Sequence, residues 1–327
     1  MIRYLGLRAL FYSMAGFTAI ALNFLIPRLM PGDPASIMFA QFQGKMPPEA
    51  LDALQESFGL SNEPLPIQFL TYLQSLLQGD FGISLLYYPS PVSEVMTQAL
   101  GWTVLLAGTA LIISFVIGTL LGIAAAWKRE GFLDKLLPPS LAFIGAFPYF
   151  WLAMLCLSIF GFELGWFPTR HAIDPQLGDA GLLAQLYSMW THAFLPGLTM
   201  VVASLGGWLM AMRNTMIAEL GTDYIHYAQI RGLSNTRVAL AYAARNALLP
   251  SVTSFGMALG FVLSGALLTE VVFGYPGQGY LLIQAVNAQD YPLMQGIFLS
   301  ITAAVLLANF LVDAVQLVLD PRLRTQS

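Results

Sequence analysis

Six apolar blocks, each about as long as a membrane-crossing helix, constrain this chain more than any other feature of its sequence. A transmembrane helix needs roughly 20 predominantly apolar residues, because it rises about 1.5 Å per residue across a hydrocarbon core about 30 Å thick. Such blocks predict an all-α, polytopic membrane protein with six transmembrane helices. The blocks cover residues 8–30, 99–127, 137–160, 192–213, 247–272 and 293–318.

The overall composition agrees with this class. Among 327 residues, 57% are hydrophobic and 10% are charged, whereas a typical soluble domain is about 25% charged. The single cysteine, Cys156, lies inside the third block, which excludes a disulfide within the chain and a cysteine-based metal site. The first block follows Arg3 and Arg8, but it is longer than a typical signal-peptide core and no small-residue cleavage motif follows it. We therefore expect this block to be a retained first span.

Lysine and arginine are distributed unequally between the segments that connect the blocks. With the N-terminus in the cytoplasm, eleven of the fourteen basic residues fall on the cytoplasmic side, and only Arg28, Lys45 and Arg170 fall outside. Cytoplasmic loops of membrane proteins carry such an excess of positive charge. We therefore expect both termini to be cytoplasmic, together with the polar insert between the fourth and fifth blocks.

This topology divides the chain into three parts. Residues 1–98 form the first span and an external helical segment. Residues 99–318 form a five-span core that contains the polar insert, residues 222–246, and residues 319–327 form a cytoplasmic tail.

Glycine and proline predict local structure at several places. Proline near the start and glycine near the end of a polar-apolar run indicate short helices. Small residues four apart, as in Gly118-x-x-x-Gly122 and Gly256-x-x-x-Gly260, let helix backbones approach closely, so we expect these positions to pack helices together. The short external helices are expected at about residues 47–59, 66–78 and 280–288.

A search for catalytic motifs finds none. The sequence has no G-x-x-x-x-G-K-[ST] phosphate loop, no H-E-x-x-H and no G-x-S-x-G. The three histidines, His171, His192 and His226, fall in an outer loop, at the start of a span and in the polar insert. We therefore expect no catalytic site, metal or cofactor in this chain.

The polar insert reads as a helix on the membrane surface. Thr222 or Asp223 is placed to cap a helix that Gly232 ends, and Ser234 is placed to cap the next helix. A plain connection between spans does not need a capped helix, so the insert is better explained as a docking element for a cytoplasmic partner. Positions i, i+3, i+4 and i+7 share one face, which we expect to point outward: Tyr224, Tyr227, Ala228 and Arg231.

A few polar and aromatic residues inside the spans are candidates for a translocation path or gate. Glu270, at the outer end of the fifth block, could line a vestibule. Asp313 shares a helix face with Asn309, but it also lies close enough to the polar tail to pair with an arginine. Phe150 and Trp208 could stack on a sugar, although aromatic residues in spans more often serve packing.

Two patterns in the insert, D-Y-x-x-x-A-x-x-x-G-L-S and then R-N-A-L-L-P, resemble the coupling loop of bacterial ABC importer permeases of the dipeptide/oligopeptide, binding-protein-dependent branch. Six further segments are similar to that branch and occur in the same order, so the resemblance covers nearly the whole chain. These segments read LMPGDP, GLSNEPLPIQFLTYLQSLLQGDFGIS, GWFPTRH, TEVVFGYPGQG, DYPLMQG and LDPRLR.

The resemblance implies a subunit that moves cargo inward by alternating access and has no catalytic site of its own. It implies a homologous second permease subunit, two cytoplasmic ATPase subunits that bind ATP and Mg, and an extracytoplasmic solute-binding protein. It also implies a multi-pass location in the lipid of a bacterial inner membrane, with no nucleic-acid partner.

In that branch, the helix matching the insert sits in a groove of an ATPase. Where the broader importer motif begins Glu-Ala-Ala, this chain has His226, Tyr227 and Ala228, which speaks against a contact through that glutamate. The resemblance implies these ATPase-coupling residues: Asp223, Tyr224, Tyr227, Ala228, Arg231, Gly232 and Ser234.

The substrate stays open between two classes. The branch as a whole indicates di- and oligopeptides, whereas the wording SLGGWLMAMRNTM before the insert is similar to a sub-branch associated with short β-linked oligosaccharides. An ion-coupled secondary transporter and a membrane-embedded enzyme are more distant alternatives. The first would need buried acids near the middle of the membrane, and the second would need a nucleophile–base pair or a metal cluster.

Overall fold

The computed structural model describes residues 2–29, 64–178 and 181–319 of the chain. Within these residues the regular structure is helical, apart from one isolated β-bridge between Ile83 and Pro91. This confirms the prediction of an all-α protein. The predicted external helix at residues 47–59 lies outside the described residues.

Four helices are long and apolar enough to cross a membrane. The second of them is a continuous run of 36 residues, in which helix α5 (Val92–Thr103) passes through a π-helical segment, η1 (Val104–Gly108), into α6. The four are α1 (Ile2–Leu29), the run that ends in α6 (Thr109–Trp127), α9 (Leu182–Leu220) and α15 (Tyr291–Leu319).

The third block is not one straight span, as the sequence predicted, but a pair of helices bent by 92°. Helix α7 (Phe132–Gly145) ends before Pro148, and α8 (Tyr149–Cys156) starts after it and continues through the π-helical segment η2 (Leu157–Glu163). Proline disfavours helical backbone at the residue before it, which explains the break at Phe147. Counted as one broken span, the pair raises the number of spans to five.

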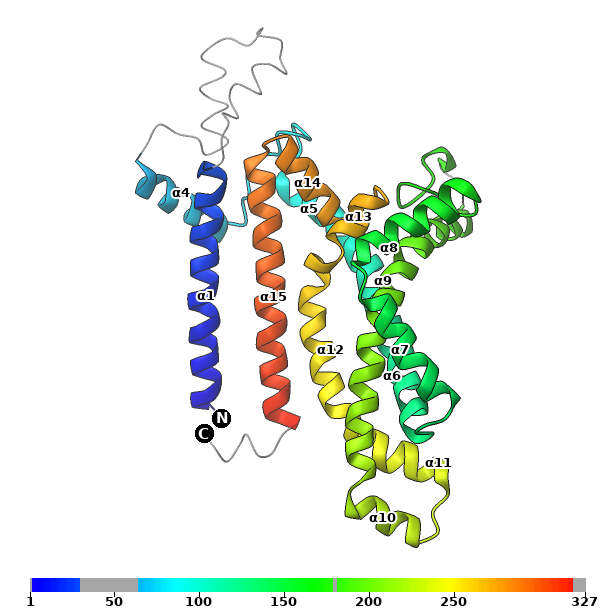
Figure 1. The fold of residues 1–327 in the computed structure, drawn as a ribbon. Coiled ribbons are helices and arrows are strands. Elements are labelled where there is room, and N and C mark those ends of the chain that lie inside the picture. Colours follow the sequence, from blue (N-terminus) through cyan, green and yellow to red (C-terminus); the bar gives the residue numbers. More distant parts are fainter. Residues whose placement is uncertain (1, 30–63, 179–180, 320–327) are drawn as a thin grey trace.

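The fifth block is also interrupted. Helix α12 (Arg245–Gly265) ends at Ala266, and the short helix α13 (Leu267–Val272) follows it. Among the described residues α12 is not one of the helices that qualify as spans by length and composition, and its first turn carries the polar pair Arg245 and Asn246. It nevertheless has 21 residues and packs between α15 and α9 (Figure 1), and it occupies most of the fifth predicted block, while α15 occupies the sixth.

Glycine pairs bring the long helices together as the sequence predicted. A Cβ atom built on Gly122 of α6 would lie 2.7 Å from the carbonyl oxygen of Leu209 in α9. A Cβ atom built on Gly256 of α12 would lie 2.7 Å from Cγ2 of Val312 in α15. Only glycine permits these approaches, which confirms that both G-x-x-x-G pairs are packing positions.

The two ends of the molecule differ in what they carry. The polar insert forms α10 (Asp223–Ile230) and α11 (Asn235–Arg237) at one end, which we call the insert end. The first residues of α1 and the last residues of α15 lie toward the same end (Figure 1). The opposite, far end carries three short helices, of which the first and last confirm predicted ones: α4 (Leu65–Leu77), α13 and α14 (Gln278–Asn287).

Candidate functional site

Helix α10 begins where the sequence predicted, at Asp223, with Thr222 in the extended conformation of an N-cap. The Thr222 side chain does not cap the helix, however. Its hydroxyl instead donates a 2.6 Å hydrogen bond to the carbonyl oxygen of Glu219 at the end of α9. The threonine therefore ties α10 to the preceding helix, and Asp223 contributes negative charge to the first turn, where the helix dipole favours it.

The end of α10 also matches its prediction. Gly232 has a φ of +74°, the left-handed conformation that favours glycine at the end of a helix. The backbone N–H of Leu233 donates to the carbonyl of Ala228 at 3.3 Å. Ser234 then takes the N-cap position of α11 through its backbone, without a capping hydrogen bond from its side chain. Helix α11 continues through the π-helical segment η4 (Val238–Ala244) into α12.

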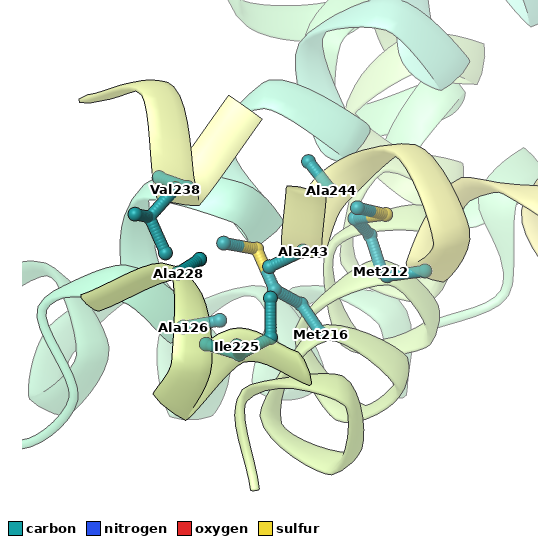
Figure 2. Close-up of a cluster of buried hydrophobic side chains, with 10 residues drawn as sticks. Ala126, Met212, Met216, Ile225, Ala228, Val238, Ala243 and Ala244 are labelled. Atoms are coloured by element: carbon teal, nitrogen blue, oxygen red, sulfur yellow. The ribbon is translucent and has the colours of Figure 1, made fainter. Parts of the chain in front are cut away.

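One side of α10 is buried against the bundle (Figure 2). Ile225 and Ala228 of this helix pack on Met212 and Met216, which lie in the last turns of α9. The remaining members of this cluster are alanines and one valine from α6, η4 and α12: Ala126, Val238, Ala239, Ala243, Ala244 and Ala247. We call this apolar cluster the insert junction.

The prediction that Ala228 belongs to the outward face of the helix is therefore wrong. Ala228 is buried, since it lies close to Ile225 on the helix surface and both pack into the insert junction. The outward face is carried instead by Tyr227 and Ile230, whose exposed fractions are 69% and 81%, together with the exposed Arg231. Spacing alone had grouped Ala228 with the tyrosines, and Ile230 was missed, although its place three residues after Tyr227 puts the two large side chains side by side on one helix face.

Tyr224 occupies the edge between these two sides. Its hydroxyl donates a 2.6 Å hydrogen bond to Oε2 of Glu219 in α9 and accepts a 2.9 Å bond from Nδ2 of Asn246 in α12. Burial, together with the bond to the Glu219 carboxylate, raises the pKa of Tyr224, so the phenol keeps the proton that it donates. Tyr224 thus joins three helices through one hydroxyl.

An ion pair lies next to the insert junction. Arg213 of α9 holds the buried carboxylate of Asp134 at the start of α7 with two bonds, Nε to Oδ1 at 2.5 Å and Nη2 to Oδ2 at 3.1 Å. The backbone N–H of Glu130 donates to the same carboxylate at 2.9 Å. Such a two-pronged contact fixes orientation as well as distance, so the turn between α6 and α7 is held against α9.

Glu270 does not line a vestibule, which corrects that prediction. Its carboxylate is fully buried at the far end of the molecule. It accepts hydrogen bonds from the Thr103 hydroxyl at 2.6 Å and from the backbone N–H groups of Gly279 and Tyr280 at 2.7 and 3.2 Å. A Cβ atom built on Gly279 would lie 2.9 Å from Oε2 of Glu270. The carboxylate therefore fastens α13, α14 and α5 to one another.

Asp313 pairs with an arginine, which is one of the two roles that the sequence left open for it. Oδ2 of Asp313 lies 3.3 Å from Nη1 of Arg8, and it accepts a 2.7 Å hydrogen bond from the hydroxyl of Tyr12. Asp313 therefore links α15 to α1. Asn309 is half-buried one turn earlier on α15.

A cavity of about 380 Å³ lies at the break between α7 and α8. Phe147, Pro148 and Tyr149 of the break form one wall, and Ser204 of α9 is a polar member of the lining. Mainly apolar side chains from η1, α6, α9 and α12 complete it. The lining does not include Trp208 or Phe150. Trp208 instead packs edge-on against Phe115, with ring centroids 5.2 Å apart.

Within the described residues, no group of three or more His, Cys, Asp or Glu side chains could hold a metal ion. The buried carboxylates all have hydrogen-bond donors from the protein as their partners. The arrangement is suited to joining helices and presenting a surface helix, rather than to making or breaking bonds.

Comparison with known proteins identifies the class. Residues 118–325 match the family described as binding-protein-dependent transport system inner membrane component. The chain is 34% identical over 304 residues to a putative peptide permease protein of Brucella suis, which covers 93% of both chains. It is 34% identical to the glutathione transport system permease protein of Salmonella typhimurium, covering 93% of this chain and 92% of that one. It is 33% identical to the dipeptide transport system permease protein of Alkalihalophilus pseudofirmus, covering 95% of each. The insert, the glycine-packed helices and these matches together show that the chain belongs to the family of permease components of binding-protein-dependent ABC importers.

Proposed function

We propose that this chain is a permease subunit that carries di- and oligopeptides inward in an ATP-driven, binding-protein-dependent importer. Three similar permeases are named for peptide, glutathione and dipeptide transport. These names favour peptides over short β-linked oligosaccharides, and glutathione is itself a small peptide. Family membership supports partner subunits in general. In our proposal they are a second homologous permease, two ATPases that bind ATP and Mg, and a solute-binding protein.

The observation that carries the proposal is the construction of α10. This helix lies at the end of the bundle, ends at a left-handed glycine and is held to the core by Ile225 and Ala228. It presents Tyr227 and Ile230 to the surroundings. Large side chains three residues apart on one exposed helix face are the anchors by which a helix docks in a groove of a partner. We assign Tyr227, Ile230 and Arg231 to the surface that enters a groove of an ATPase.

The proposal also sets the orientation in the membrane. ATPases work in the cytoplasm, so α10 and both chain termini are placed there. The excess of lysine and arginine on that side agrees with this placement. Cysteines introduced at Asn235 and Gln78 in a Cys156→Ala background test it in intact cells with a membrane-impermeant thiol reagent. Labelling at position 78 only is expected, and labelling at position 235 only would reverse the orientation.

Co-purification tests the docking surface. Ile230→Asp should abolish recovery of the ATPases with the tagged permease, because the aspartate would lose its hydration in an apolar groove. Leu77→Asp is the matched control, since Leu77 is 90% exposed on α4 at the far end. Full recovery of the ATPases with Ile230→Asp, equal to that of the control, would exclude α10 as the docking element.

The substrate is tested on the partner solute-binding protein. Calorimetric titration with di- and tripeptides should show binding, and titration with β-linked disaccharides should not. Binding of disaccharides alone would replace peptides by the oligosaccharide alternative while leaving the importer assignment intact.

A further inference from the structure

Two tyrosines on α10 lie in different surroundings. Tyr227 points outward and belongs to the proposed docking surface. The hydroxyl of Tyr224 points back to the permease, where Glu219 and Asn246 bind it. Glu219 lies in the last turn of the 39-residue helix α9, and Asn246 lies in the first turn of α12.

The linkage of Tyr224 to α9 and α12 requires a hydroxyl that both donates and accepts a hydrogen bond. The hydroxyl has one proton to donate, which goes to a carboxylate at 2.6 Å, and its oxygen accepts from an amide at 2.9 Å. Hydrogen bonds to a charged acceptor are shorter and stronger than neutral ones. Phenylalanine has the same ring and could make neither bond.

The apolar contacts of the insert junction, beside Tyr224, are not directional as these hydrogen bonds are. Ile225 and Ala228 meet methionines and alanines there. Apolar contact is non-directional, and methionine adapts to irregular spaces. Burial therefore holds α10 against the bundle without setting the position of α10 along α9 and α12. That position is defined by directed bonds: the bond of Thr222 to the carbonyl of Glu219 ties α10 to α9, and the hydrogen bonds of Tyr224 tie it to both α9 and α12.

The two helices joined by Tyr224 also line the cavity at the break between α7 and α8. Met200, Ala203 and Ser204 of α9 line it, and Ala258 and Val262 of α12 line the side near them. Residues of the break between α7 and α8 line the same cavity. A displacement of α10 that carries both α9 and α12 with it would change the shape of this cavity, because both helices contribute to its lining.

We propose that Tyr224 is a positioning residue that makes α9 and α12 follow α10, so that movement of a docked ATPase reaches the cavity walls. This inference rests on the proposed function, since it needs an ATPase on α10. It separates two roles within one helix. Tyr227 and Ile230 bind the partner, and Tyr224, through Glu219 and Asn246, transmits its movement.

The test uses the whole importer in proteoliposomes and measures cargo uptake per ATP hydrolysed. Tyr224→Phe should lower this ratio roughly tenfold, the order expected when a hydrogen bond to a charged group is lost, while the ATPases still co-purify. Tyr187→Phe is the matched control, because Tyr187 is a tyrosine of 69% exposure at the far end of α9, and its ratio should equal that of the wild type. A residue that only stabilises the fold would change the yield of folded complex but not this ratio.

A double-mutant cycle adds a second measurement that does not depend on one variant. Asn246→Ala alone should lower the ratio of uptake to hydrolysis, and it should have no further effect in the Tyr224→Phe background, because the bond is already absent there. Glu219→Gln keeps an acceptor oxygen and should retain more of the ratio than Glu219→Ala.

The possible failures are distinguishable. A wild-type ratio in Tyr224→Phe, or additive effects in the cycle, would overturn the transmission role while leaving docking untouched. Loss of the ATPases from Tyr224→Phe would also overturn it, by placing Tyr224 in the docking surface. If the ATPases do not bind the wild-type permease, the proposed function itself fails.

Discussion

The two ends of this permease differ in the buried polar groups that accompany their apolar contacts. At the insert end, the insert junction consists of alanines, methionines, one isoleucine and one valine. At the far end, two fully buried carboxylates, Glu270 and Asp290, gather hydrogen bonds from several helices and a loop. We call this second cluster the far junction. The insert junction depends on the removal of apolar surface from water, whereas the far junction adds directed bonds to an apolar cluster that α5, α14 and α15 bury beside it.

The far junction is specified atom by atom. Asp290, just before α15, accepts from the Ser84 hydroxyl at 2.5 Å and from the backbone N–H groups of Leu86 and Leu293 at 3.0 and 3.1 Å. Glu270 accepts three bonds in the same manner. A buried hydrogen-bond network has few alternative arrangements with all groups satisfied, so this end of the molecule is expected to keep one geometry.

The insert junction has many nearly equal arrangements, because small apolar side chains can shift without losing a specific bond. Its position relative to the bundle depends on the few polar linkages beside it, chiefly that of Tyr224. Buried, hydrogen-bonded carboxylates thus mark the rigid end of this chain, and small apolar contacts mark the adjustable end. The following substitutions test it, from the largest expected effect to the smallest.

Glu270→Ala should have the largest effect. It leaves the Thr103 hydroxyl and the N–H groups of Gly279 and Tyr280 buried without an acceptor, at about 1–3 kcal/mol each. A loss of roughly 3–9 kcal/mol in the free energy of unfolding is expected, visible as a lower thermal unfolding temperature and aggregation in size-exclusion chromatography. Glu94→Ala, at an exposed glutamate of α5, is the control. Equal stability of the two variants would mean that the far junction is not held by its carboxylates.

Ala228→Glu should rank second. A charge placed in the insert junction would have no partner there, which costs about 3 kcal/mol or more unless the helix moves out. Because α10 lies at the end of the bundle, we expect it to detach rather than the whole fold to unfold. Protease sensitivity of the insert should rise and the ATPases should be lost.

The neighbouring substitution Gln229→Glu adds the same charge on the exposed side of α10 and serves as its control. If both variants resist protease equally and keep their ATPases, Ala228 is not enclosed as we describe.

Gly232→Ala should have a smaller, purely conformational effect. A Cβ atom at this position would meet nothing within 4 Å, but the φ of +74° is strained for any residue with a Cβ atom, at a cost of about 1–2 kcal/mol. Gly207→Ala in α9 also has open space around it and lacks the positive φ. Because alanine favours helix over glycine by about 1 kcal/mol, this variant should be slightly stabilised. Opposite signs in thermal unfolding are expected, and equal signs would contradict the left-handed end of α10.

The smallest effect concerns pH at the far junction. Burial raises the pKa of Asp290 above its ordinary value of 3.8. A carboxyl whose pKa rises on folding stabilises the fold when protonated, so its contribution is fully present below pH 3.8 and is lost as the pH rises through the raised pKa. Tyr87, whose pKa burial also raises, keeps its proton throughout this range.

The wild type should therefore become more stable relative to Asp290→Asn as the pH falls from about 7.5 to about 4. The measurement is the difference between their unfolding temperatures at the two pH values. A difference that does not change with pH would show that Asp290 does not titrate in this range.

The sequence by itself determined the features that depend on neighbours along the chain. Long apolar runs predicted the membrane helices, proline and glycine predicted α4 and α14, and the G-x-x-x-G pairs predicted close packing. The end of α10 at Gly232 followed from the conformational freedom of glycine. These are local rules, because hydrogen bonds, backbone conformation and apolar length act within a few residues of one helix.

Only the tertiary structure decided what each helix face meets. Periodicity grouped Ala228 with the tyrosines, but the packing of Ile225 on Met216 turned that alanine inward. The sequence predicted Glu270 to line a vestibule, but its carboxylate binds the hydroxyl of Thr103, which lies 167 positions earlier in the chain. The residue spacing of a helix predicts which side chains share a face. Which face is buried depends on helices from distant parts of the chain, and local spacing does not predict which of them will pack there.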